Sequence, residues 1–348
     1  MKVTLKQIAE RAGVHISTVD KVIHNRGGVS KEVADNIRKI IKELGYKTNP
    51  TGRALQRSGK RYRIAVLLLK NDAVDDLRKG IHDAVQEMAF QVETTYIVTG
   101  VRDSQAQADY IDFAVEKHYD GLIIMPIYSK IVSEAIDRAA QAGVPAITVN
   151  SDISESGRLC YIGQFGEQEA AIAGRVMGVM LQGRGDVAIV TSSLHPDQAD
   201  LNVKVRESRF AEYLQKHYPE IRIVHYIECF EDRIIAQVEM EHLLQERPEL
   251  SGIYVTCGCV DTVAKAVKRA GREKQIAILG FEDYPEILKL IREDVIDCTI
   301  AGELLKMGKQ SIIVMMDYLV QGTEPENCCT YMDVRVLFKE CICAPDEV

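Results

Sequence analysis

Two short amphipathic stretches separated by a glycine-containing turn occupy residues 4–26. Thr4 and Gln7 have the spacing of a capping box, and apolar residues then recur at the three- and four-residue spacing of a helix. After the turn at 12–14, a second apolar stripe leaves one polar face available for contacts. The polar residues on this face are Ser17, Thr18, Asp20, Lys21, His24 and Asn25. The arrangement predicts a helix-turn-helix, whose second helix enters the major groove of DNA.

A third helix is expected between Ser30, which can cap it, and Gly45, which ends it. Its core face comprises Val33, Ile37, Ile40, Ile41 and Leu44. We therefore assign residues 1–48 to a three-helix DNA-binding domain. An ordinary helical hairpin in a core is the alternative interpretation of this region.

The charge distribution favours DNA binding over a core hairpin. Residues 1–63 hold 15 Lys and Arg against 5 Asp and Glu, whereas the whole chain carries a net charge of −8. The basic residues continue past the third helix as Arg53, Arg57, Lys60, Arg61 and Arg63. A basic head on an acidic body indicates that only the head approaches a polyanion, and that its binding depends strongly on salt. The alternative for the basic run is a solvated charged face.

The lack of a signal region and of a long apolar run predicts a cytosolic protein. The first residues lack an apolar signal region, and no uninterrupted apolar run reaches the roughly 18 residues of a membrane span. The nine cysteines all follow residue 159, and none form a CxxC pair. We expect reduced thiols packed as small hydrophobic groups, with neither metal nor cofactor. A metal or redox role remains the alternative for them.

From residue 62, buried apolar runs alternate with amphipathic segments. The expected strands are 64–69, 94–98, 121–126, 146–150, 186–191, 221–228, 252–256 and 276–281. This alternation is typical of α/β folds with parallel sheets covered on both faces. Eight such units can close a barrel or form two doubly wound lobes. We favour two lobes, because residues 151–166 consist of turn residues without a crossover helix.

The chain is therefore expected to contain three regions: the head at 1–48, a hinge or linker at 49–61, and a ligand-binding and dimerisation domain at 62–348. The first lobe is expected at about 62–162 and 298–325, and the second at about 163–297 and 326–348. In doubly wound sheets, ligands bind beyond the carboxyl ends of the strands, so two facing lobes predict a binding cleft.

The chain resembles the lac repressor (LacI/GalR) family of transcriptional regulators, whose bodies resemble periplasmic sugar-binding proteins. The matching head residues are Thr4, Leu5, Ile8, Ala9, Ala12, Gly13, Val14, Thr18, Val19 and Val22. Weaker markers in the body are 120–124, 143–145, Arg206 with Phe210, and 280–283. The resemblance implies a homodimer that binds double-stranded operator DNA, with a small-molecule effector in the cleft that tunes DNA affinity.

The resemblance also implies roles for residues of the head. The recognition helix is about 16–25, with Ile16, Ser17 and Lys21 at base-reading positions and Thr18 nearer the phosphates. Lys21 suits guanine, whereas Ile16 suits a thymine methyl group. His15 and Asp20 stand where the family usually has Ser.

Residues 49–57 match the family's hinge helix, which inserts a leucine into the minor groove. Leu55 holds that position, and a wedge of this kind kinks the duplex. Gly52 departs from the pattern and costs about 1 kcal/mol inside a helix. A core residue within a linker is the alternative for Leu55.

Candidate effector-binding residues follow the expected strand ends. They are Asn71, Asp72, Tyr128, Asn150, Ser151, His195, Arg206, Asp261 and Glu282, with Asp152 and Asp283 as further candidates. Planar amide, carboxylate and guanidinium groups suit the neighbouring hydroxyls of a sugar or polyol. Asp261 has a helix cap as its alternative. The usual aromatic sandwich is absent, since Ala73 and Val74 stand in its place, and Gly302 stands where Gln is frequent.

The sequence therefore predicts a regulator, most simply a repressor, rather than an enzyme. The common nucleophile, phosphate-loop, zinc-protease and dinucleotide motifs are missing. A sugar-transport binding protein explains the body but leaves the basic head unused. A sugar-responsive activator would use both regions, and an effector-independent DNA-binding protein would use the head and leave the cleft empty.

Overall fold

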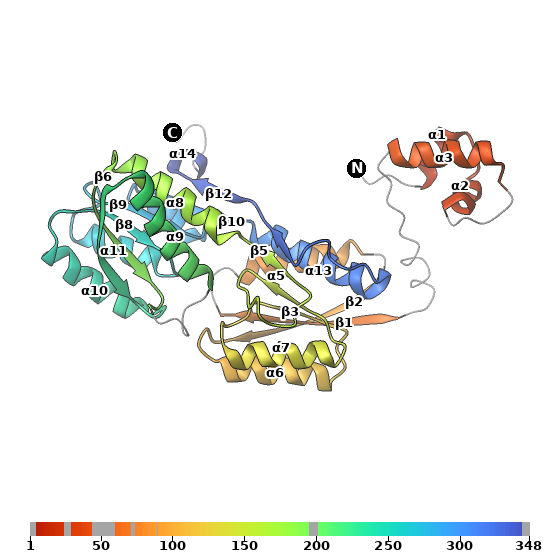
Figure 1. Ribbon diagram of the computed structural model, residues 1–348, viewed down its shortest axis with the longest axis horizontal. Helices are drawn as coiled ribbons and strands as arrows, with labels where there is room; N and C mark the ends of the chain where they lie inside the picture. Colours follow the sequence, from red (N-terminus) through yellow and green to blue (C-terminus); the bar gives the residue numbers. More distant parts are fainter. Residues whose placement is uncertain are drawn as a thin grey trace. The chain divides into compact units, whose positions relative to one another are not determined.

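The computed structural model describes residues 5–23, 29–43, 60–70, 74–88, 90–194 and 201–342. It divides into two compact units, residues 1–60 and 61–348 (Figure 1). None of the helices within these ranges combines the length and apolar character of a membrane span.

The described residues of the first unit form three helices. They are α1 (Leu5–Ala12), α2 (Ile16–Ile23) and α3 (Lys31–Glu43). Gly13 adopts a φ of 64° in the turn between α1 and α2, a left-handed conformation that glycine reaches without steric cost. The Ser30 hydroxyl accepts a 3.4 Å hydrogen bond from the Val33 amide at the start of α3, as its predicted capping role requires. The buried core is Ile8, Ala9, Val19, Val22, Ile37 and Ile40.

The first lobe of the second unit is a six-stranded sheet in the order β11-β5-β4-β3-β1-β2. Its strands are β1 (Arg61–Leu69), β2 (Gln91–Thr99), β3 (Gly121–Ile124), β4 (Ala146–Val149), β5 (Cys160–Gly163) and β11 (Cys329–Tyr331). Its helices are α5 (Val74–Gln86), α6 (Ser104–Glu116), α7 (Lys130–Gln141) and α13 (Leu304–Gln321). All pairings are parallel, and Figure 1 shows α6 and α7 on the face opposite α5 and α13.

The second lobe is a six-stranded sheet in the order β12-β10-β9-β8-β6-β7, in which β12 alone is antiparallel. Its strands are β6 (Arg184–Thr191), β7 (Glu220–Glu228), β8 (Leu250–Val255), β9 (Ala277–Phe281), β10 (Cys298–Gly302) and β12 (Val334–Leu337). Its helices are α8 (Gly166–Met180), α9 (Leu201–His217), α10 (Arg233–Glu246), α11 (Val260–Arg269), α12 (Pro285–Arg292) and α14 (Lys339–Ile342).

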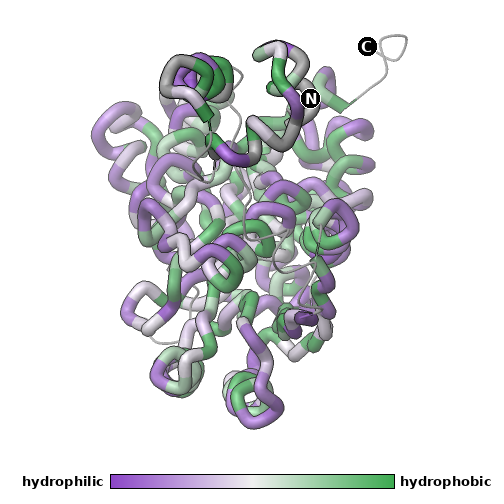
Figure 2. Tube along the Cα trace, turned by 90° about the vertical axis from the view of Figure 1, so that its right-hand side faces the viewer, coloured by the Kyte–Doolittle hydropathy of each residue, from purple (hydrophilic) through white to green (hydrophobic). Residues whose placement is uncertain are grey.

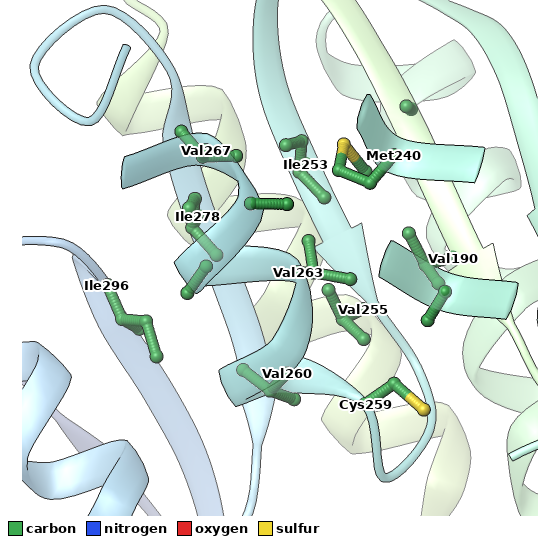
Figure 3. Close-up of a cluster of buried hydrophobic side chains, with 14 of the residues drawn as sticks. Val190, Met240, Ile253, Val255, Cys259, Val260, Val263, Val267, Ile278 and Ile296 are labelled. Atoms are coloured by element: carbon green, nitrogen blue, oxygen red, sulfur yellow. The ribbon is translucent and has the colours of Figure 1, made fainter. Parts of the chain in front are cut away.

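Within each lobe, hydrophobic side chains are buried on both faces of the sheet, and this burial stabilises the lobe. In the second lobe, side chains of β8 and α11 pack into one cluster (Figure 3), which includes Ile253, Val263 and Met240 from α10. A separate cluster lies under α8 and α9. Figure 2 shows hydrophilic and hydrophobic residues alternating along the outer helices, as expected for helices with one buried and one exposed face.

The helix α13 returns to the first lobe and packs closely on α5. A Cβ atom at Gly80 would overlap the carbonyl oxygen of Leu305, and one at Gly308 would overlap that of Leu77. The two helices therefore approach at backbone contact, which only glycine permits at these positions.

The chain crosses between the lobes at residues other than those predicted. Residues 298–302 form β10 in the second sheet rather than part of the first lobe, and 329–331 form β11 in the first sheet rather than part of the second. The turn-rich segment 151–166 also contains β5, a strand of only four residues. These four residues stand among turn residues, so the sequence pattern did not single them out as a strand.

Candidate functional site

The helix predicted to be the recognition helix corresponds to α2. Val19 and Val22 face the core, whereas Lys21 is exposed and Thr18 is half-buried. The Thr18 amide donates a 2.8 Å hydrogen bond to the carbonyl oxygen of His15 as the helix begins. Ile16 and Ser17 lie in its first turn. The DNA-binding candidates of the head and hinge also include Thr4, His24, Asn25, Arg53 and Leu55, which lie outside the described residues.

A cavity of about 910 Å³ lies between the two lobes of the second unit. Its walls are the segments that follow β1 to β4 in the first lobe and β6 to β9 in the second, joined by one face of α9. Both sheets thus present the carboxyl ends of their strands to one space, where doubly wound folds bind ligands. The volume falls in the range of small-molecule sites.

Three predicted residues of the first lobe line this cavity: Tyr128, Asn150 and Ser151. Asn150 has a φ of 63°, a left-handed conformation that asparagine tolerates better than most side chains. The Ser151 hydroxyl donates a 2.8 Å hydrogen bond to the carbonyl oxygen of Pro126, which ties the ends of β4 and β3 together. Asn71 and Asp72 lie outside the described residues.

Arg206 of α9 also lines the cavity, and an ion pair with Glu169 of α8 holds it in place. Its Nε and Nη2 atoms donate to the two carboxylate oxygens at 2.9 and 3.2 Å. The guanidinium carbon lies 3.7 Å from the centre of the Phe281 ring, which adds a cation–π contact. Burial by itself lowers the pKa of Arg206, but the Glu169 carboxylate outweighs it, so the pKa is raised and the side chain stays charged.

Glu282 follows β9 and lines the same wall of the cavity. Its backbone is left-handed, with a φ of 76°, and its carbonyl oxygen accepts a 2.6 Å hydrogen bond from the Thr299 hydroxyl. Burial raises the pKa of its carboxyl group, while the charge of Arg206 acts in the opposite direction. The two oxygens of this carboxyl group can accept hydrogen bonds from the hydroxyl groups of a ligand.

The predicted effector-binding residue Asp261 is not among the described residues that line the cavity. It lies in the first turn of α11 and is 2% exposed. Its carboxylate accepts hydrogen bonds from Arg233 at 2.9 Å, Lys265 at 3.1 Å and the Tyr284 hydroxyl at 3.2 Å. Since Arg233 and Tyr284 do line the cavity, Asp261 positions lining residues instead. The predicted His195 lies outside the described residues.

The sequence did not single out several polar residues of the cavity wall. They are Lys70, Arg102, Ser104, Ser129, Ser192, Ser193, Glu231, Arg233 and Tyr284. Most of them follow the end of a strand by one to five residues, so the rule used for the predicted candidates also applies to them. The further candidates Asp152 and Asp283 instead pair with Arg158 at 2.6 Å and with Arg335 at 2.6 Å.

Three thiol groups gather beside the cavity. The sulfur atoms of Cys229, Cys257 and Cys259 all lie within 4.8 Å of one another. Hydrogen bonds from the other two thiols lower the pKa of Cys229, and the same interactions, together with burial, raise the pKa of Cys257. The other buried cysteines in the described part of the chain, Cys160 and Cys298, lie in strands of the two sheets.

Two family descriptions match the chain. Residues 64–324 match the periplasmic binding protein domain, and residues 4–49 match the lacI family of bacterial regulatory proteins. A binding-protein fold fused to a DNA-binding head defines a class of ligand-responsive regulators. The chain belongs to the periplasmic binding protein domain family over residues 64–324, and it carries a lacI-type DNA-binding domain at its head.

Individual proteins support this assignment. The HTH-type transcriptional regulator DegA of Bacillus subtilis is 28% identical over 156 residues, which are 44% of this chain and 45% of DegA. The chain thus aligns with about half the length of that relative. The regulator GntR of Pseudomonas aeruginosa is 27% identical over 297 residues, 81% of this chain and 80% of GntR.

A solved structure shows the same fold for the body. The solute-binding protein of an ABC transporter from Burkholderia graminis, in complex with D-arabinose, superposes with a TM-score of 0.75 at 27% identity. The match covers 80% of this chain and 96% of that protein.

Proposed function

We propose that this protein is a transcriptional repressor whose affinity for operator DNA is set by a sugar or polyol bound between its lobes. The observation that supports this proposal most directly is that one chain contains both a lacI-type head and a cavity lined by residues at the carboxyl ends of the strands of both sheets. The proposal includes a cytoplasmic homodimer, because two heads are needed to contact the two halves of a near-palindromic operator.

The character of the cavity wall supports a polyhydroxylated ligand. Arg206, Asn150 and Glu282 supply a guanidinium, an amide and a carboxyl group, each able to contact two neighbouring hydroxyls. Phe281 and Tyr284 provide apolar ring surface on the same side. The solute-binding protein with the similar fold holds a pentose, which supports the same ligand class.

Ligand binding can control DNA binding only if it favours one arrangement of the lobes. The ligand contacts both lobes, so it stabilises the closed arrangement relative to the open one. In a dimer, closure changes the spacing of the two hinges, which we assign to residues 49–61. Only one spacing allows both α2 helices to enter successive major grooves.

The test combines two measurements on the full chain. A panel of neutral sugars, polyols and sugar acids is screened by thermal unfolding, and each hit is added to a titration of the chain's own upstream DNA at fixed salt. A ligand that raises the melting temperature and weakens operator binding supports a repressor, whereas one that strengthens operator binding supports an activator or a corepressed regulator. Turnover of the ligand would favour an enzyme.

The matched control is Lys21→Ala, which changes an exposed residue of α2 far from the effector cavity in sequence. It is expected to lose operator affinity and to keep the ligand-induced rise in melting temperature. Operator binding that no ligand in the panel changes would instead favour an effector-independent DNA-binding protein.

A further inference from the structure

Two loops of the second lobe converge on one cluster of sulfur atoms. Cys229 directly follows β7, and Cys257 and Cys259 follow β8. The Sγ atoms of Cys229 and Cys257 are 3.4 Å apart, and all three Sγ atoms lie within 4.8 Å of one another. All three residues are buried, with exposed fractions of 0%, 6% and 1% in chain order.

The two loops follow strands that are not neighbours in the sheet. In the sheet, β6 lies between β7 and β8. The amide of Cys229 donates to the carbonyl oxygen of Thr191 at the end of β6, at 2.9 Å, and the amide of Thr256 donates to that of Val190, also at 2.9 Å. Both loops are therefore anchored on the end of β6.

A second contact fixes the two loops to each other. Glu231 has a left-handed φ of 57°, and its carboxylate accepts a 3.0 Å hydrogen bond from the Gly258 amide. A Cβ atom at position 258 would lie 2.8 Å from that carboxylate oxygen, so glycine allows the close approach. The sulfur cluster therefore lies on two loops that are hydrogen-bonded to each other. Cys160 and Cys298, by contrast, lie within strands.

We propose that Cys229, Cys257 and Cys259 form a binding site for one thiophilic d10 cation, zinc(II) or copper(I), held by three thiolates. Thiolates are the soft ligands that select these ions, and each coordinated thiol releases its proton. With a zinc–sulfur bond of about 2.3 Å, two sulfurs on one tetrahedral zinc are about 3.8 Å apart. The observed separations, from 3.4 Å to no more than 4.8 Å, bracket this value.

The start of α11 favours negative sulfur atoms at this position, and it does so against burial and the nearby Glu231 carboxylate. Cys259 is the N-cap residue of α11, and its side chain makes no capping hydrogen bond. The amino-terminal end of this ten-residue helix therefore directs its positive dipole end and unpaired amides toward the cluster. Figure 3 shows Cys259 in the loop that leads from β8 into α11, at the edge of the hydrophobic cluster.

The site lies in the wall of the effector cavity. Cys257, Gly258 and Cys259 line it from one loop, and Phe230 and Glu231 line it from the other. A bound ion would cross-link these loops and hold that wall in one conformation. Three protein ligands leave the fourth position of zinc for water, whereas copper(I) is satisfied by three thiolates.

The test uses the full-length protein, reduced and stripped of metal under argon. Zinc(II) is titrated against a chromophoric chelator of micromolar affinity, and copper(I) against a copper(I)-selective chelator. We expect one equivalent of at least one of the two ions to be taken from its chelator. X-ray absorption of that complex is expected to give three sulfur scatterers, and this readout on the unaltered protein does not depend on variants that fold.

Cys257→Ser and Cys259→Ser are expected to weaken binding by more than about 100-fold, since loss of even an outer partner of a metal ligand costs 10–100-fold. The matched control Cys298→Ala removes a buried cysteine from β10 and is expected to bind as the unaltered protein does. Failure to compete for either ion, binding undiminished in Cys259→Ser, or fewer than three sulfur scatterers would each overturn the proposal. These results leave the DNA titration unaffected, so the two proposals fail independently.

Discussion

Replacing Arg206 by Met leaves the Glu169 carboxylate buried without its partner, and we expect a large loss of stability. The two side chains are 11% and 1% exposed, so water screens the ion pair little. Removal of one partner from a buried pair costs about 3–5 kcal/mol, because the remaining charge keeps its desolvation penalty. The lost contact with Phe281 adds to this cost.

The measurement is urea-induced unfolding followed by circular dichroism. Arg206→Met is expected to lower the free energy of unfolding by about 3–5 kcal/mol, and the double variant Arg206→Met/Glu169→Met is expected to recover most of it. Arg209→Met is the matched control on the same helix, because its partners Glu167 and Glu212 are about half exposed and the pair contributes little.

Two results would refute this reasoning. One is a cost below about 1 kcal/mol for Arg206→Met, which would mean that the pair is not desolvated. The other is a double variant as unstable as the single one, which would place the cost in packing rather than in the unpaired charge. The recovered double variant also serves a second purpose: it should still lack effector binding if Arg206 contacts the ligand.

Gly80→Ala should destabilise the effector domain by about 1–3 kcal/mol in thermal unfolding, because the added Cβ would overlap the Leu305 carbonyl. The control Gly100→Ala should be neutral, because a Cβ at that position would have no atom within 4 Å. Burial raises the pKa of Glu282, so its charged form costs stability above the ordinary glutamate pKa. Glu282→Gln should therefore raise the melting temperature at neutral pH, with a gain that shrinks toward pH 4; an equal gain at both pH values would contradict this. Lys21→Ala should weaken operator binding by about 1–3 kcal/mol in anisotropy titrations, and an unchanged preference over random DNA would exclude base reading.

The hinge assignment carries its own prediction. We assign Leu55 as the residue that enters the minor groove, so Leu55→Ala should weaken specific operator binding while binding to random DNA remains nearly unchanged. Equal affinity of both proteins for the operator, measured at one salt concentration, would remove this role.

The long buried strands could be predicted from the sequence, because continuous apolar runs such as residues 64–69 are typical of strands in a sheet that is covered on both faces. The short strands β3 and β4 could be predicted too, whereas β5 and β10 could not. Residues 160–163 stand among turn residues, and 298–302 contain threonine, alanine and glycine between the apolar residues. Their place in the sheets depends on pairing with distant strands, which local pattern does not record.

The candidate site could also be predicted only in part. Residues next to strand ends, such as Tyr128 and Asn150, line the cavity because parallel strands deliver their carboxyl ends to one edge. The same rule selected Asp261, whose carboxylate accepts hydrogen bonds from Arg233 and Tyr284, because a position near a strand end does not state which way the side chain points. The partner of Arg206 was not predictable either, since Glu169 precedes it by 37 residues on a different helix.

The central claim is that ligand in the cavity controls DNA binding by the head. Its most direct measurement is the operator dissociation constant at fixed salt, with and without a saturating ligand identified by thermal shift. The account predicts at least a fivefold change, the lower end of typical allosteric coupling of about 1–3 kcal/mol. An operator affinity that stays the same at full ligand occupancy would contradict it.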